Sequence, residues 1–576
     1  MEAIPSAVQV RHTHPMKTAT RSLGLAALVA WMCAGSAAGQ TPAIGAAPPH
    51  LEQRGGAIQL IVDGRPFLAL AGELHNSSSS SIQYMKPVWP RLAAMHLNTV
   101  LAPVAWETIE AQENHFDFGI VDGLLAGARD NHLKLVVLWF GAWKNTYSTY
   151  VPAWVKTDLR RFPRVQTGDG RETERLSPFS PAVRDADTKA FAQLMRHLHE
   201  VDAVTHTVLM VQVENEVGVI PESRDHSAVA EAAFAGAVPP NLVRFIQQHH
   251  MTLDPQFRAT WEQAGAKSAG TWRELFGASP LTDDLFMAWN YSTYVEHVAA
   301  AGKAQYPLPM YANAALIRPN YQPGQYNSGG PLPHSLDVWR AGAPSLDFLS
   351  PDLYFNEFAQ WAGWYARAGN PLFIPEAQGG AAGAANALYA YGHLAAIGFS
   401  PFGIDDLDNA PLDLAGITGA AEHPSGATLS DAYAVLSNLA PLFLDKQRAG
   451  GIDAVLIEGP AQRAARLAIG QYVATVAPVS GADAVNSRLA AVFIQTAPSE
   501  FLVVGSGDAQ ITFAASSPGS PLVGIESIDE EFFENGAWTP GRRLNGDESS
   551  QGQALRVHGN DLARGRIYKV RLYRYR

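Results

Sequence analysis

Residues 206–218 read HTVLMVQVENEVG, an apolar run that ends abruptly in Glu214, Asn215 and Glu216. A short, continuous apolar run predicts a strand that is buried on both faces, and such strands are typical of parallel sheets. Gly218 then indicates a loop. The stretch therefore predicts a buried strand whose carboxyl end carries two carboxylates and an amide.

Similar short apolar runs recur along the chain, and helical patterns separate several of them, at 89–96, 121–131, 187–201 and 357–368. Strands that alternate with helices predict a parallel sheet, and eight such strands close a (β/α)₈ barrel. We therefore expect an α/β fold, a TIM barrel over residues 56–444. Its expected strands are 67–71, 99–103, 135–139, 208–213, 310–314, 348–353, 372–375 and 397–402.

The gap between the fourth and fifth expected strands is long and has helical patterns of its own, which predict a helical insertion near residues 219–300. Loops that follow barrel strands lie on the face where barrel enzymes place their active sites. The insertion should therefore shape a pocket on this face.

The pattern changes at both ends of the expected barrel. Residues 39–55 are rich in Gly, Pro and Ala and predict a linker. After about residue 445, short alternating stretches are separated by Gly, Pro, Ser and Asp, and the chain ends in RIYKVRLYRYR at 566–576. Alternation at period 2 predicts strands with one buried face. Residues 445–576 therefore predict a C-terminal antiparallel β-sandwich.

The first 38 residues have the pattern of an export signal. Met16, the expected true start, is followed by basic residues, an apolar run at 23–33 and small residues at 36–38. A bilayer span needs about 20 apolar residues, and this run is shorter. We expect residues 1–38 to be cleaved, leaving no membrane span and an exported protein, periplasmic or extracellular.

Composition excludes several kinds of partner and chemistry. The net charge of −12 argues against a nucleic-acid partner, because phosphate binding needs clustered Lys and Arg. The single cysteine, Cys33, lies in the expected signal, so disulfides and cysteine-based sites are not expected after cleavage. His249 and His250 are adjacent rather than four residues apart, the spacing that places two ligands on one helix face. We expect no metal and no cofactor, and the sequence does not indicate the oligomeric state.

A second strand-end carboxylate stands in PLFIPEAQ at 371–378, where Pro375 ends the strand pairing and presents Glu376 at the rim. The fourth and seventh strands face each other across a barrel mouth, so Glu216 and Glu376 should converge. Hydrolysis of a glycosidic bond needs two carboxyl groups that flank it, about 5–5.5 Å apart for retention and about 6.5–9.5 Å for inversion. The pair predicts a carbohydrate substrate, with Asn215 bonded to the sugar 2-hydroxyl. The alternative for each Glu is a solvated or ion-paired structural carboxylate.

Rim positions supply further candidates for sugar contacts, each of them equally consistent with a structural role. Residues 143–145 are the strongest, because a ring, a cation and an amide in one loop supply stacking and hydrogen bonds to hydroxyls. The candidates are Glu73, Glu107, Trp143, Lys144, Asn145, Tyr291 and Tyr354.

Residues 212–218, QVENEVG, resemble the hallmark of glycoside hydrolase family 35, as do Leu97-Asn98-Thr99 and Pro152-Ala153-Trp154. The resemblance covers roughly residues 55–410. It implies a retaining barrel enzyme that removes terminal β-linked galactose without a cofactor, with Glu216 as acid/base and Glu376 as nucleophile.

The chain also departs from that family. Val217 stands where Tyr is usual, and Pro103 and Ala142 replace a Tyr and a Glu that contact galactose in better-known members. The sequence is therefore similar to a divergent bacterial branch that pairs the barrel with one C-terminal β-domain.

The expected function is that of a secreted, exo-acting, retaining β-galactosidase. Export and this branch of the family suggest polysaccharide-derived substrates, for instance galactosylated side chains of xyloglucan. Two alternatives stay open. A barrel glycosidase with another specificity, such as a β-glucosaminidase or β-glucosidase, would keep both Glu residues. A non-catalytic carbohydrate-binding protein on a degenerate barrel would hold them too far apart to act.

Overall fold

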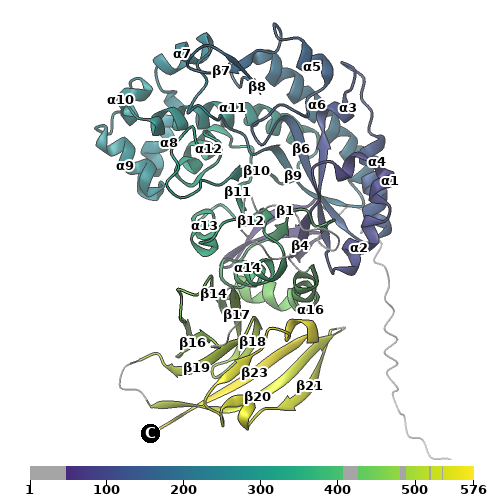
Figure 1. Cartoon of the computed structure of the whole chain (residues 1–576), viewed down its shortest axis with the longest axis vertical. Helices are drawn as coiled ribbons and strands as arrows, with labels where there is room; N and C mark the ends of the chain where they lie inside the picture. The colour runs from purple at the N-terminus through teal and green to yellow at the C-terminus, as the bar shows by residue number, and fades with distance from the viewer. Residues whose placement is uncertain (1–46, 407–425, 480–487, 518–520, 535) are drawn as a thin grey trace, which may run out of the picture. The chain divides into compact units, whose positions relative to one another are not determined.

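The computed structural model describes residues 47–406, 426–479, 488–517, 521–534 and 536–576 (Figure 1). The expected export signal, residues 1–38, lies outside the described residues. Among the helices that are described, none combines the length and the apolar character needed to cross a membrane.

Eight parallel strands close into a barrel, in the order in which they occur along the chain, and the last pairs with the first through Gly398 and Ala69. A strand lies at each of the eight expected positions, so the predicted TIM barrel is confirmed. The strands are β4 (Ala69–Glu73), β5 (Thr99–Ala105), β6 (Lys134–Lys144), β9 (Val208–Asn215), β10 (Met310–Ala315), β11 (Phe348–Leu353), β12 (Phe373–Ala377) and β13 (Gly398–Pro401).

Helices surround the barrel and bury an apolar face against it. α6 is an example: Ser180 accepts a hydrogen bond from the Val183 backbone at its start, and Phe191 and Leu194 are fully buried. The larger helices are α2 (Val88–Ala94), α4 (Gly119–Asp130), α6 (Pro181–Asp202), α11 (Pro280–Gln305), α12 (Leu336–Gly342), α13 (Phe358–Tyr365), α14 (Gly380–His393) and α16 (Gly426–Ala449). Short ones are α1 (Ile82–Met85), α3 (Trp106–Ile109) and α5 (Ala153–Thr157).

Between β9 and β10 the chain forms the expected helical insertion. It comprises α7 (Ala228–Ala235), α8 (Pro240–His249), α9 (Pro255–Gln263) and α10 (Trp272–Phe276). The long helix α11 then packs along α6, closely enough that a side chain at Gly302 would overlap the Phe191 ring. A small hairpin of β7 (Arg164–Gln166) and β8 (Glu172–Leu176) precedes α6.

A three-stranded sheet of β1 (His50–Arg54), β2 (Ala57–Val62) and β3 (Arg65–Phe67) precedes the barrel. Leu60 and Val62 belong to the same buried cluster as Leu101, Leu138 and other residues of the barrel strands. The barrel interior is therefore apolar on this side. Residues 50–54 correct the expected linker, since they form β1 and pair with β2.

After α16, two antiparallel sheets share one core, as predicted for the C-terminal region, with Val503 and Val570 from one and Ile511 and Leu555 from the other. One sheet contains β14 (Ile452–Ile457), β17 (Leu489–Ala497), β18 (Glu500–Ser506), β23 (Arg566–Tyr575), β20 (Leu522–Glu534) and β21 (Ala537–Arg543), in that order. The other contains β15 (Ala465–Ile469), β16 (Tyr472–Pro478), β19 (Ala509–Ala515) and β22 (Leu555–Val557).

Candidate active site

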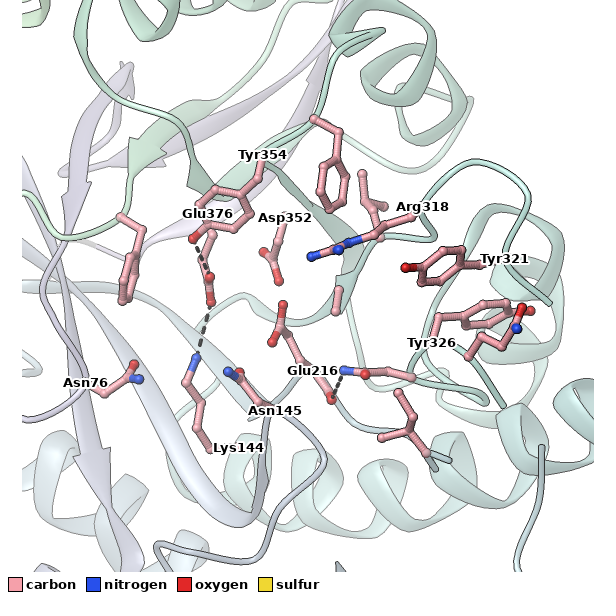
Figure 2. A pocket seen from close by; sticks show the side chains of 17 residues that line it. Asn76, Lys144, Asn145, Glu216, Arg318, Tyr321, Tyr326, Asp352, Tyr354 and Glu376 are labelled. Atoms are coloured by element: carbon pink, nitrogen blue, oxygen red, sulfur yellow. Dashed lines mark hydrogen bonds and ion pairs between the residues drawn. The ribbon is translucent and has the colours of Figure 1, made fainter. Parts of the chain in front are cut away.

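A pocket of about 350 Å³ opens at the carboxyl ends of the barrel strands (Figure 2). Both predicted catalytic carboxylates line it, and so do three of the predicted sugar contacts, Lys144, Asn145 and Tyr354. Its other lining residues are Asn76, Ile220, Ala315, Leu316, Arg318, Tyr321, Gln325, Tyr326, Asn327, Asp352, Phe355 and Phe402.

Glu216 and Glu376 come from opposite sides of the barrel and meet in this pocket. Glu376 lies within β12, and Glu216 follows β9 with a left-handed backbone (φ 45°). The Glu216 backbone N–H donates to Asn313 Oδ1 at 3.0 Å, which holds this turn against β10. One carboxylate oxygen from each of Glu216, Asp352 and Glu376 lies within 4.8 Å of the other two. The geometry suits two groups that act on one bond.

Three donors surround the Glu376 carboxylate. The Tyr354 hydroxyl donates to Oε2 at 2.7 Å, and Asn215 Nδ2 donates to Oε1 at 3.2 Å. Lys144 Nζ lies 3.5 Å from Oε1. Two hydrogen-bond donors and one ammonium group therefore contact the Glu376 carboxylate.

The pKa of Glu216 is raised to about 7. Burial is the main cause, and the negative charge of Glu376 also raises this pKa, whereas the positive charge of Lys144 lowers it. A carboxyl group with a pKa near neutrality can hold a proton and release it at the same site. The two Glu residues therefore have different surroundings: donors contact the Glu376 carboxylate, whereas burial raises the pKa of Glu216.

Asp352 and Asn313 belong to the site although they were not predicted from the sequence. Asn313 Nδ2 donates to Asp352 Oδ2 at 2.7 Å, so this amide joins Asp352 to the Glu216 backbone. Burial, then the charges of Glu376 and Glu216, raise the pKa of Asp352 well above its usual range. Both residues interrupt apolar strands, in YANAA and FLSPDL, and a polar residue inside such a run was the available signal.

Glu73 ends β4 and is fully buried, but it does not line the pocket. Within the described parts of the chain, neither of its carboxylate oxygens has a hydrogen-bond partner. Burial, then the charge of Glu376, raises its pKa well above the usual range. Burial would lower the pKa of Lys144, but the surrounding carboxylates, Glu376 foremost, raise it overall. Lys144 therefore remains a cation among these carboxyl groups.

Glu107, Trp143 and Tyr291 do not line this pocket, although Glu107 lies just beyond the end of β5 as expected. Glu107 pairs with Lys156 Nζ at 3.0 Å. Trp143 is fully buried, and its Nε1 donates to the Leu176 carbonyl at 3.1 Å. Tyr291 lies inside α11 rather than in a loop, and its ring packs edge-on against Trp143.

A buried pair of carboxyl groups supports the strand that carries Lys144. Glu214 accepts hydrogen bonds from the backbone N–H groups of Ala142 (3.2 Å) and Trp143 (2.8 Å). Its carboxyl group is also hydrogen-bonded to Asp187, which accepts from Trp139 Nε1 at 2.9 Å. Burial, then the Asp187 charge, raises the pKa of Glu214 well above its usual range. Glu214 therefore links the backbone just before Lys144 to Asp187.

Two groups of carboxylate and histidine side chains in the described residues have the spacing of a metal site. One is the cluster of Glu216, Asp352 and Glu376, where the Lys144 ammonium lies 3.5 Å from Glu376. The other is His75 with Asp405 and Asp406, where Asp405 is engaged by His75 Nδ1 at 3.1 Å and by Ser78 Oγ at 2.6 Å.

Residues 83–276 match the sequence model of glycoside hydrolase family 42, described as β-galactosidase. The matched segment contains Glu216 and ends before Glu376. This part of the barrel is therefore similar in sequence to β-galactosidases of that family. Because the match is to family 42, the resemblance to family 35 is not confirmed. Residues 429–556 match a domain of unknown function, DUF5597, and no curated protein sequence matches the chain.

Several solved structures are similar to this fold. The β-galactosidase from Bacillus circulans sp. alkalophilus is 14% identical with a TM-score of 0.44, over 66% of this chain and 57% of that one. The β-galactosidase from Rahnella sp. R3 is 16% identical with a TM-score of 0.42, over 65% and 57%. The β-amylase catalytic domain from Paenibacillus polymyxa is 12% identical with a TM-score of 0.42, over 61% and 97%. The chain thus spans 57% of the length of the two β-galactosidases.

Proposed function

We propose that this protein is a retaining glycoside hydrolase that releases terminal β-linked galactose, with Glu376 as nucleophile and Glu216 as acid/base. The observation that carries the proposal is the meeting of their carboxylate oxygens within 4.8 Å in one pocket. So close an approach is compatible with the retaining arrangement, in which the carboxyl groups lie about 5–5.5 Å apart. The choice of galactose rests on the β-galactosidase family match of residues 83–276.

In the first step, a Glu376 oxygen attacks the anomeric carbon and the glycosidic C–O bond breaks. Glu216 gives its proton to the departing oxygen, so the leaving group is released as an alcohol. The product is a covalent glycosyl ester on Glu376. Lys144 and Tyr354 lose their ionic partner at this point, since the ester is neutral.

The second step reverses the roles. Esterification removes the charge of Glu376, one of the causes that raise the pKa of Glu216, so Glu216 becomes a stronger acid and stays ionised. It then takes a proton from water as the water oxygen attacks the anomeric carbon. Cleavage of the ester restores the Glu376 carboxylate and gives galactose with its original anomeric configuration.

Asn215 is suited to the sugar 2-hydroxyl. Its Nδ2 donates to Glu376, while its Oδ1 is buried without a hydrogen-bond partner among the described residues. An acceptor beside the nucleophile matches a hydroxyl donor on the neighbouring sugar carbon, a contact that strengthens in the transition state.

We also propose that the protein is exported, periplasmic or extracellular, and acts on polysaccharide-derived chains such as galactosylated xyloglucan side chains. The basic, apolar and small-residue order of residues 16–38 supports export. Amino-terminal sequencing of protein secreted by a bacterial host tests it. A start near residue 39 is expected, and retention of residues 16–38 in the cell-associated protein would contradict it.

The test of the function uses 4-nitrophenyl β-galactoside, β-glucoside and β-glucosaminide with the wild type, Glu216→Ala and Glu376→Ala. We expect cleavage of the galactoside alone and a loss of about 10⁴-fold or more in both variants. Glu107→Gln is the matched control, because Glu107 is a carboxylate outside the pocket.

Azide distinguishes the two roles. With Glu216→Ala, azide should react with the glycosyl ester and yield the β-galactosyl azide. With Glu376→Ala, it should occupy the space of the lost carboxylate and yield the α-azide. The same azide anomer from both variants would overturn the assignment, and exclusive cleavage of another glycoside would replace galactose as the substrate.

A further inference from the structure

The pocket is longer than the proposed catalytic steps require. Figure 2 shows Asn76, Lys144 and Glu376 on one side of Glu216, and Arg318, Tyr321 and Tyr326 on the other. The second group belongs to the segment 316–327 that follows β10. None of its side chains takes part in the reaction proposed above.

The position of Glu216 identifies what this second half receives. A general acid protonates the oxygen of the leaving group, so the leaving group lies on its side of the bond. The nucleophile lies behind the sugar that is transferred. The half of the pocket beyond Glu216 therefore faces the leaving group, if the proposed function is correct.

One wall of this half is rigid. The Tyr326 hydroxyl donates to the buried Asp284 Oδ2 at 2.6 Å, and His334 Nε2 lies 2.8 Å from the same oxygen. Asn327 Nδ2 donates to the Glu216 carbonyl at 3.2 Å. A wall that is tied to the buried core and to the acid/base residue keeps its shape before a ligand binds.

Two other side chains of the segment, Arg318 and Tyr321, make no such hydrogen bonds to the described residues. Among the described residues, the Arg318 guanidinium has no hydrogen bond or ion pair, and its recorded contact is a cation–π approach of 5.5 Å to the Phe355 ring. The Tyr321 side chain is 41% exposed and also lines the pocket. A half-buried guanidinium with five unused N–H donors lies beside a flat aromatic ring.

This pairing matches the chemistry of a sugar ring. The apolar C–H face of a pyranose can stack on the Tyr321 ring, and the planar fork of Arg318 can donate to two adjacent hydroxyl oxygens. An alkyl or aryl leaving group would leave the guanidinium donors unpaired, which costs binding free energy when they are desolvated.

We propose that Arg318 and Tyr321 form a subsite for a hydroxylated sugar on the leaving-group side, so that the protein is selective for β-galactosyl disaccharides and oligosaccharides. The inference rests on the proposed function and deepens it. Recognition of the leaving sugar should be expressed mainly in the glycosylation step, because that sugar has departed before the second step.

The test compares a β-galactosyl disaccharide with β-galactosyl fluoride, whose leaving group reaches neither residue. Arg318→Met and Tyr321→Ala should lower kcat/KM for the disaccharide about 10- to 100-fold and change that for the fluoride less than about 3-fold. Tyr321→Phe, which keeps the ring, should retain most of the disaccharide activity. Gln322→Ala is the control, since Gln322 is an exposed neighbour in the same segment that does not line the pocket.

The outcomes separate the two proposals. If the wild type cleaves neither galactosyl compound, the proposed function fails. If Arg318→Met and Tyr321→Ala leave the disaccharide rate unchanged, or lower both substrates equally, the subsite is overturned while the function stands. Soluble, folded variants are verified by their retained rate on the fluoride.

Discussion

Lys144 Nζ lies 3.5 Å from Glu376 Oε1, and both side chains are almost completely buried. Glu73, Glu216 and Asp352 also act on this ammonium electrostatically, so one cation serves a cluster of four carboxyl groups. A buried charge without a partner costs several kcal/mol, and the cluster would be expected to take up protons if the cation were removed. Lys144 therefore lowers the pKa of two of these carboxyl groups, Glu216 and Glu73.

Lys144→Met is expected to lower kcat by about 100-fold or more, the usual range for loss of one electrostatic contact to the reacting groups. It should also move the pH profile. Lys144 lowers the pKa of Glu216, so its removal raises that pKa, and the loss of activity at high pH should shift upward. The pH dependence of kcat/KM measures the shift. A reduced rate with an unchanged profile would mean that Lys144 acts without affecting Glu216.

The wild-type pH profile should fall on its alkaline side near the Glu216 pKa of about 7. Glu216 must be protonated to release an alcohol, so kcat/KM for an alkyl or sugar galactoside should decrease as pH rises through this value. β-Galactosyl fluoride needs no proton on its leaving group and should lack this alkaline decrease. Matching alkaline limbs for both substrates would contradict the assignment of Glu216 as the acid.

Tyr354→Phe removes the hydroxyl that donates to Glu376 Oε2 at 2.7 Å. A hydrogen bond to a charged group contributes about 1.5–3 kcal/mol, so kcat should fall about 10- to 100-fold while the thermal midpoint changes little. The ring itself remains in place in the pocket wall. Steady-state kinetics and thermal unfolding check both expectations, and a large loss of stability would assign Tyr354 a structural role instead.

The barrel could be predicted because its strands are continuous apolar runs, and both proposed catalytic carboxylates directly follow such runs in the sequence. β21 was not predicted, since all of its residues are exposed and the sequence shows no alternation there. Asn313 and Asp352 were missed for a related reason: they lie within strands, where the expected role of a residue is packing.

The segment with Trp143 and Lys144 shows a different limit. The sequence predicted a strand ending at residue 139 and a rim loop after it, whereas β6 continues to Lys144. Adjacent residues on a strand point to opposite faces, so Lys144 reaches the pocket and Trp143 is buried in the surrounding core. The extension depends on the buried Glu214–Asp187 pair, a tertiary contact that no local pattern reveals.

The Glu214–Asp187 pair leads to the last prediction. Glu214→Ala would remove the acceptor for the Ala142 and Trp143 backbone N–H groups and leave Asp187 without its carboxyl partner, which should cost about 2–5 kcal/mol of unfolding free energy. Glu214→Gln keeps one acceptor oxygen and its amide can donate to Asp187, but the second backbone N–H then faces the amide NH2 group instead of an oxygen. This variant should therefore lose about 1–3 kcal/mol at pH 5, less than Glu214→Ala.

The stability of the wild type and that of Glu214→Gln should change differently as pH rises. The pKa of Glu214 is raised by folding, so its contribution to stability is complete below the unfolded value of about 4.3 and is lost progressively above it, up to the folded pKa. One such group changes the unfolding free energy by up to about 1.4 kcal/mol per pH unit. Between pH 5 and pH 8 the wild type should therefore lose more stability than Glu214→Gln, as measured by denaturant unfolding at each pH. Equal losses in the two proteins would show that Glu214 is already ionised at pH 5 and that no proton is shared with Asp187.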